Sequence, residues 1–204
     1  MKKPSDWAGT QESLANCIFA VGLAIILITA SKISSPLEIA MLAASSITMF
    51  YFWWGYLFLA KSGLESRKIT EYLYDFTIAL LLIGLFYITG LTNENKQKFW
   101  LVTYFVLFVG TVIKYALLLN RENSKSKIIF LKEKIKIDSG AAVFIFMLVL
   151  AAIFLKMEMF AIWGIFAMEL GHILYVGIYS NFYEKYRNLR FISSNTKPRK
   201  YRPR

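Results

Sequence analysis

The chain has 204 residues, of which 57% are hydrophobic and only 18% are charged, and its mean hydropathy is +0.48. Ordinary soluble domains contain about 45–50% apolar and about 25% charged residues. The apolar residues come in runs long enough to cross a bilayer, which takes about 20 residues. This composition excludes a soluble enzyme, a secreted disulfide scaffold and a disordered chain. It predicts an all-α, polytopic integral membrane protein.

Six membrane spans are predicted, followed by a basic cytoplasmic tail. The spans cover residues 14–33, 37–60, 72–91, 99–119, 141–155 and 159–180, and the tail covers 181–204, so that residues 1–180 form one helical bundle. Only Lys156, Met157 and Glu158 separate the fifth span from the sixth, and no Gly or Pro marks a turn there. A tight hairpin is predicted at this point. The alternative, one apolar helix of about 40 residues, far exceeds the thickness of a membrane.

The distribution of basic residues predicts the orientation. Nineteen of the 24 basic residues lie before the first span, in every second loop after it or in the tail, whereas four lie in the alternate loops and Lys114 lies inside the fourth span. Positive charge marks the cytoplasmic side, so both termini are expected in the cytoplasm of a prokaryote, with the chain in its inner membrane. Trp100 and Trp163, which begin spans four and six, are expected at the outer interface.

Motifs that carry catalysis or bind cofactors are absent. Cys17 is the single cysteine and His172 the single histidine, which excludes an internal disulfide, a thiolate cluster and every zinc motif that needs two histidines. No phosphate-binding loop, nucleophile elbow or dinucleotide fingerprint occurs. We therefore expect a non-enzymatic protein with no cofactor and no metal, in which Cys17 is a buried thiol.

Ionisable residues inside the predicted spans form the first candidate site. They are Glu169, His172, Lys114 and Asp75. An unpaired charge at the bilayer centre costs at least about 2.5–3.5 kcal/mol, and all four lie in the cytoplasmic half, so they are predicted to form one water-accessible cluster. Alternatively, Lys114 extends to the headgroups, Asp75 caps or pairs near the interface, and Glu169 contacts His172 or Lys114 to hold helices together.

A basic, amphipathic cytoplasmic loop over residues 121–140 forms the second candidate. The segment would form a strand or a helix. It would dock on anionic headgroups, with an attraction of about 1 kcal/mol per basic residue, or on a cytoplasmic protein. Asp138 would cap the helix that follows. The tail adds basic residues for the same lipid contact, and nucleic acid is an unlikely partner. The candidate docking residues are Ile128, Phe130, Leu131, Lys132, Lys134, Lys136, Arg199, Lys200 and Arg202.

Six spans with both ends inside and an Ala20-xxx-Ala24 step resemble the substrate-binding subunits of energy-coupling-factor vitamin transporters, which implies solute uptake. The architecture is also similar to small membrane subunits of phage-defence systems such as Kiwa. No sequence motif assigns the chain to either group. The leading functional hypothesis is a subunit that self-associates in the bilayer and docks a cytoplasmic partner, for example as a sensor or anchor in a defence system. The alternative is a channel or transporter that uses Glu169, His172, Lys114 and Asp75.

Overall fold

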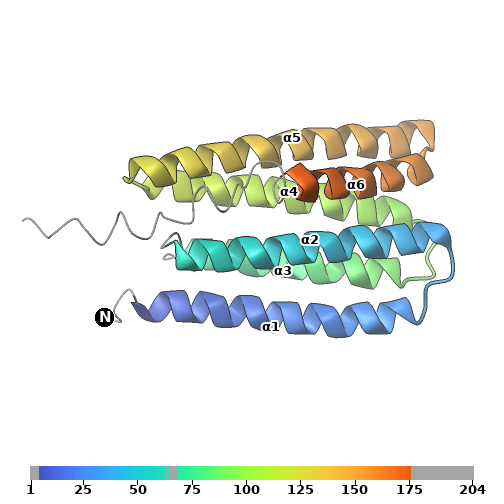
Figure 1. Cartoon of the computed structure of the whole chain (residues 1–204). Coiled ribbons are helices and arrows are strands. Elements are labelled where there is room, and N and C mark those ends of the chain that lie inside the picture. The colour runs from blue at the N-terminus through green and yellow to red at the C-terminus, as the bar shows by residue number, and fades with distance from the viewer. Residues whose placement is uncertain (1–4, 63, 65–68, 176–204) are drawn as a thin grey trace, which may run out of the picture.

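A computed structural model describes residues 5–62, 64 and 69–175, and within these ranges the chain forms helices and no strand. The helices lie side by side, and each runs opposite to the one before it (Figure 1). We name the two ends of the bundle after Ser5, where α1 begins, and after Lys156, which follows α5. The helices are α1 Ser5–Ala30, α2 Pro36–Lys61, α3 Ile69–Thr89, α4 Lys96–Arg121, α5 Lys125–Leu155 and α6 Glu158–Ile173. The predicted all-α class is confirmed.

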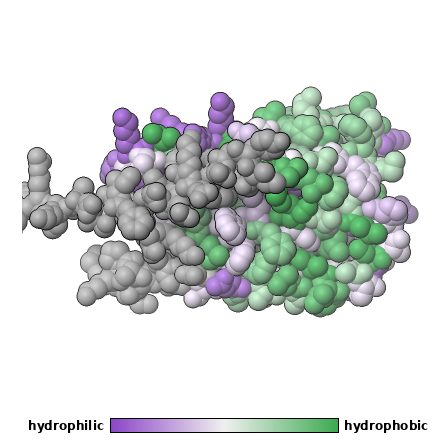
Figure 2. Space-filling model, viewed as in Figure 1, coloured by the Kyte–Doolittle hydropathy of each residue, from purple (hydrophilic) through white to green (hydrophobic). Residues whose placement is uncertain are grey.

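Four helices in the described part of the chain are long and apolar enough to cross a membrane. They are Pro36–Ala60, Glu71–Thr89, Lys96–Arg121 and Lys125–Leu155. The segment Ala15–Ala30 is a shorter apolar helix, and α6 spans 16 residues. Apolar side chains cover the face shown in Figure 2 toward the Lys156 end, and hydrophilic side chains gather over the first turns of α5. These four helices indicate a membrane protein.

The start of α2 is fixed by a capping box. The Ser35 side chain accepts the Glu38 N–H at 3.2 Å, and the Glu38 carboxylate accepts the N–H groups of Ser34 and Ser35. Pro36 occupies the first helical position, where its missing N–H costs nothing. Lys96, the first residue of α4, pairs with the same Glu38 carboxylate, so the starts of α2 and α4 are joined at the Lys156 end.

A tight turn joins α5 to α6, so the single long helix, the alternative to the predicted hairpin, does not form. Lys156 adopts the left-handed conformation with φ 54°, which Gly or Asn would adopt at lower cost. Beyond the turn, α6 packs closely on α5. A Cβ added to Gly164 would lie 3.0 Å from Leu148 Cδ1, and such glycines allow membrane helices to approach each other.

The predicted basic loop is helical for most of its length, because α5 begins at Lys125 rather than near residue 141. The helix has 31 residues and is about 46 Å long at 1.5 Å per residue. The prediction of a loop over 121–140 is therefore wrong beyond residue 124, and the strand alternative is wrong. The apolar side chains of this segment form a core instead: Phe130 and Leu131 pack with Leu59 and Leu118. Burial of that face explains why the segment continues the helix.

The positions of one tryptophan and of the single cysteine also differ from expectation. Trp100 is fully buried and its indole donates to Ser45 Oγ at 3.0 Å, so its ring packs inside the bundle rather than on the outer surface. Cys17 is exposed on the outside of α1 rather than buried. Both differences depend on which way a helix face points, and an apolar run without polar breaks does not indicate this.

Candidate functional site

Buried and half-buried polar side chains from five helices line up along the bundle core. Those of α2 and α4 recur at intervals that keep them on one face of each helix. We call the set the polar column. It consists of Ser45, Thr48, Tyr51, Tyr56, Asp75, Trp100, Tyr104, Thr111, Lys114, Lys134, Asp138, Glu169 and His172.

The first pair in the column joins Asp75 of α3 to Lys114 of α4. Their side chains are 2% and 4% exposed. The Tyr56 hydroxyl of α2 donates to Asp75 Oδ1 at 2.9 Å, and the Lys114 ammonium lies 3.7 Å from the centre of the Tyr56 ring, a cation–π distance. Lys114 is therefore paired in the core and does not extend to the headgroups. Asp75 pairs as one alternative expected, but between helices and deep in the core.

The second pair, Lys134 with Asp138, lies within α5 at the i,i+4 spacing. Lys134 also donates to the Tyr51 hydroxyl of α2, and its ammonium lies 4.5 Å from the centre of that ring. Sequence reasoning missed this pair because it placed both residues in a loop and made Asp138 a helix cap. The available signal was the i,i+4 spacing of Lys134 and Asp138 on the helical face that carries Leu131.

Glu169 and His172 of α6 lie beside the second pair and have unsatisfied polar atoms. Tyr104 donates to Glu169 Oε1 at 2.7 Å, but Glu169 Oε2 and both ring nitrogens of His172 have no hydrogen-bond partner. Glu169 is 1% and His172 9% exposed. Lys134 interacts electrostatically with both groups. An unsatisfied buried polar atom costs about 1–3 kcal/mol, so this concentration on one turn is unusual.

The four residues predicted as one cluster thus fall into two groups. Lys114 pairs with Asp75, whereas Glu169 and His172 lie with Lys134 and Asp138. Neither the expected Glu169–Lys114 contact nor a Glu169–His172 hydrogen bond forms, since Glu169 accepts its hydrogen bond from Tyr104.

A small cavity lies between the two ion pairs. Its volume of about 20 Å³ admits a water molecule, which needs about 10–15 Å³. The polar side chains that line it are Tyr51, Tyr56, Thr111, Lys114, Tyr115, Lys134 and Asp138. Water in this cavity would have several hydrogen-bonding partners.

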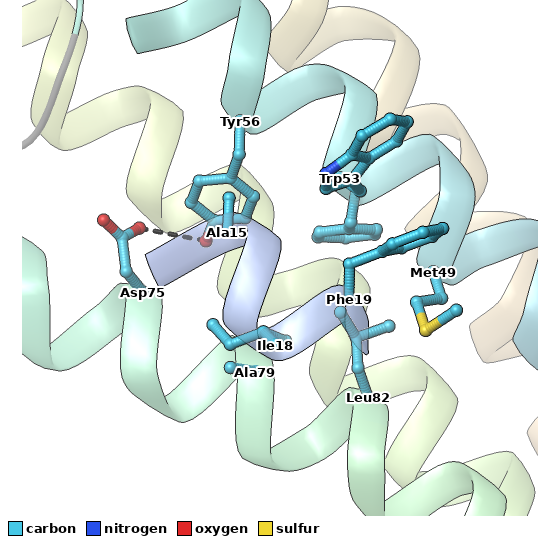
Figure 3. Close-up of a pocket in the computed structure, with 10 residues that line it drawn as sticks. Ala15, Ile18, Phe19, Met49, Trp53, Tyr56, Asp75, Ala79 and Leu82 are labelled. Atoms are coloured by element: carbon cyan, nitrogen blue, oxygen red, sulfur yellow. Dashed lines mark hydrogen bonds between the residues drawn. The ribbon is translucent and has the colours of Figure 1, made fainter. Parts of the chain in front are cut away.

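A second cavity, of about 30 Å³, lies between α1, α2 and α3 (Figure 3). Its walls are mostly apolar and include Phe19, Met49 and Trp53, while Asp75 and Tyr56 form its polar end. Because Tyr56 lines both cavities and Asp75 binds Lys114, the first ion pair separates the polar cavity from the apolar one.

Aromatic rings fill the column toward the Lys156 end. Trp100 and Tyr104 have ring centres 4.8 Å apart, and Tyr104 stacks on Phe108 at 5.6 Å. Tyr104 also contacts the Thr48 hydroxyl. Glu169 therefore lies between Tyr104 of this ring stack, which donates to it, and Lys134, which lines the water-sized cavity.

The candidate docking residues separate into buried and exposed sets. Phe130, Leu131 and Lys134 are at most 1% exposed, so they cannot contact a partner, and this part of the prediction is wrong. Ile128 is half-buried, while Lys132 and Lys136 are exposed. Arg199, Lys200 and Arg202 lie outside the described residues. Lys125, Ile129, Lys132 and Lys136 follow one exposed face of α5 at spacings of four, three and four, and we call them the basic stripe.

No group of three or more His, Cys, Asp or Glu side chains that could hold a metal ion occurs in the part of the chain that the structure describes. Comparison of the chain with family models, curated proteins and solved structures gave no match.

Removing one partner of the first ion pair should destabilise the bundle. We expect Lys114→Met to cost about 3–5 kcal/mol, because it leaves the Asp75 carboxylate buried without its cation. Lys114→Met combined with Asp75→Leu should recover most of that loss, since both charges are then gone. Lys132→Met, at an exposed position of α5, is the matched control. Thermal unfolding in detergent measures all three, and equal midpoints for Lys114→Met and Lys132→Met would contradict the assignment.

Proposed function

We propose that the chain is a non-enzymatic, ion-conducting membrane protein, a channel or transporter subunit whose pathway is the polar column. The observation that supports this best is the group of unsatisfied polar atoms on Glu169 and His172. Both groups interact with Lys134, which lines a water-sized cavity. Ionisable residues that face the interior of a membrane bundle commonly mark ion and proton pathways.

A purely structural role for the polar column does not explain the unsatisfied polar atoms of Glu169 and His172 on α6. The Asp75–Lys114 and Lys134–Asp138 pairs have their charges matched and also receive or donate hydrogen bonds with tyrosines, as expected of side chains that hold helices together. Glu169 uses only one of its two oxygens, and His172 uses neither nitrogen. A hydrogen-bonding species that enters the core would satisfy these atoms.

Tyr104 is proposed as the gate of this pathway. Its ring lies between Trp100 and Phe108, and its hydroxyl donates to Glu169. A change in the charge or position of Glu169 would therefore act directly on the ring that closes the Lys156 side. The described conformation represents the closed state in this proposal.

The orientation predicted from the charge distribution completes the proposal. The Ser5 end would face the cytoplasm of a prokaryote, and α1 and α6 would cross the inner membrane with the four longer helices. Self-association in the bilayer remains part of the proposal, because the small residues Ala20, Ala24, Ala167 and Gly171 are exposed on the outside of the described bundle and permit close helix contacts.

The conduction hypothesis predicts a current that depends on Glu169. Purified protein in a planar bilayer should carry current above the protein-free level, and Glu169→Gln should return it to that level, because the amide cannot carry the carboxylate charge. Glu94→Gln, the same change at an exposed loop position, should leave the current unchanged. The absence of any current from the wild type, or equal currents for the two variants, would refute the proposal.

The basic stripe supports a second candidate function, the docking of a soluble cytoplasmic partner. Lys125, Lys132 and Lys136 present three positive charges on one exposed face of α5, with Ile129 as an apolar contact 45% exposed. Such a face is complementary to an acidic protein surface. The buried residues of the same segment no longer require a partner to cover them, so this candidate depends on the stripe alone.

Charge reversal tests docking. Lys132→Glu with Lys136→Glu should abolish the salt-sensitive capture of an acidic soluble protein from native membranes, because the complementary charges then repel. Lys134 is left intact, since its substitution would break a buried pair. The matched control, Lys32→Glu with Lys98→Glu, reverses two exposed lysines at the Lys156 end. Recovery of this chain alone before and after the substitutions would leave lipid headgroups as the partner and refute docking.

A further inference from the structure

We infer that the species conducted by the polar column is the proton, and that Glu169 binds and releases it in transit. The inference rests on the proposed conduction. It follows from three properties of the column, namely its width, its charge balance and the chemistry of its side chains.

The cavity in the column holds about one water molecule. It lies beside Lys134 and Asp138 and has about 20 Å³, and Trp100, Tyr104 and Phe108 stack with ring centres 4.8 and 5.6 Å apart where Tyr104 meets Glu169. A hydrated metal ion or an organic solute needs many times that space. A proton crosses such a place by transfer between hydrogen-bonded groups, which needs only small movements.

The charges in the column do not favour a metal cation. Asp75 and Asp138 are each neutralised by a buried lysine, so Glu169 is the one carboxylate of the column without an ion-pair partner in the described residues. Calcium takes six to eight oxygen ligands and magnesium a full octahedron, and potassium filters use rings of carbonyl groups. One carboxylate oxygen and one imidazole supply too few ligands for any of these ions.

The groups that face Glu169 are able to exchange protons or orient water. They are Thr48 of α2, Tyr104 of α4 and Lys134 and Asp138 of α5. Tyr51 of α2 contacts both Lys134 and His172 of α6 and so joins the imidazole to this group. A proton that arrives through water in the cavity binds the free oxygen, Glu169 Oε2, and converts the carboxylate to a neutral acid. When Tyr104 moves aside, the acid returns the same proton to water on the Lys156 side and becomes a carboxylate again. One proton enters and one leaves, and no bond between heavy atoms changes.

His172 is placed to pass the proton to Glu169. It lies one turn from Glu169 on α6, its ring centre is 4.6 Å from that of Tyr51, and both of its nitrogens are free to accept or donate. Tyr51 lines the cavity, so the imidazole lies next to the cavity wall. In this arrangement His172 assists the transfer and Glu169 is required for it.

The reversal potential of the bilayer current tests the inference. With identical KCl on both sides and a tenfold proton gradient, the wild-type current should reverse near about 59 mV, the value for a tenfold ratio of a singly charged ion. Glu169→Gln should lose the current. Glu169→Asp, which keeps a carboxyl group, should retain a smaller current with the same reversal potential. His172→Gln should also reduce the current and leave the reversal potential unchanged. Glu94→Gln should match the wild type in both current and reversal potential.

The outcomes separate this inference from the proposed function. A current that reverses at zero under the proton gradient, but shifts when a KCl gradient replaces it, would refute proton selectivity and keep ion conduction. Equal loss of current in Glu169→Gln and Glu169→Asp would refute proton binding at this carboxyl, provided that both variants unfold at the wild-type temperature. The absence of any wild-type current would refute the proposed function itself.

Discussion

The Asp75–Lys114 ion pair is the interaction on which the rest of the core depends. A lysine in the interior of an apolar bundle must find a counter-charge, because hydrocarbon cannot solvate it. Here the counter-charge comes from α3 and the supporting hydroxyl from Tyr56 of α2, while the lysine belongs to α4. Three helices are thereby held at one level. The Lys134–Tyr51 contact joins α5 to α2, and the cavity lies between the two ion pairs.

This arrangement separates the groups that hold the bundle together from those available for function. The lysines and aspartates satisfy each other, so their charges cancel in pairs and they determine how the helices pack. Glu169 and His172 are held in the same core by that packing, but with polar atoms to spare. Their cost of about 1–3 kcal/mol per unsatisfied atom is offset by the apolar contacts of α6, whose Ala161, Ile162 and Ile165 are fully buried.

The sequence predicted the parts of this structure that depend on composition and on local length. Apolar runs predicted the helical class, and the hairpin at Lys156 followed from membrane thickness although no turn residue marks it. The same arguments failed where burial depends on a distant partner. Lysines at 132, 134 and 136 look alike in the sequence, yet only Lys134 faces Tyr51 and the core. The loop predicted over residues 121–140 separated two apolar spans, and its basic, amphipathic pattern did not show which side chains would be buried. In the structure Lys125, Lys132 and Lys136 lie on an exposed stripe, whereas Lys134 and Asp138 form a buried pair.

Infrared difference spectroscopy of the protein in lipid vesicles, between low and high pH, tests most directly whether Glu169 exchanges protons with water. The account predicts a carbonyl band of a protonated buried carboxyl group at low pH that is lost in Glu169→Gln, retained in Glu94→Gln and shifted when heavy water replaces water outside. A band that persists in Glu169→Gln, or the absence of any buried carboxyl band that responds to pH, would contradict it.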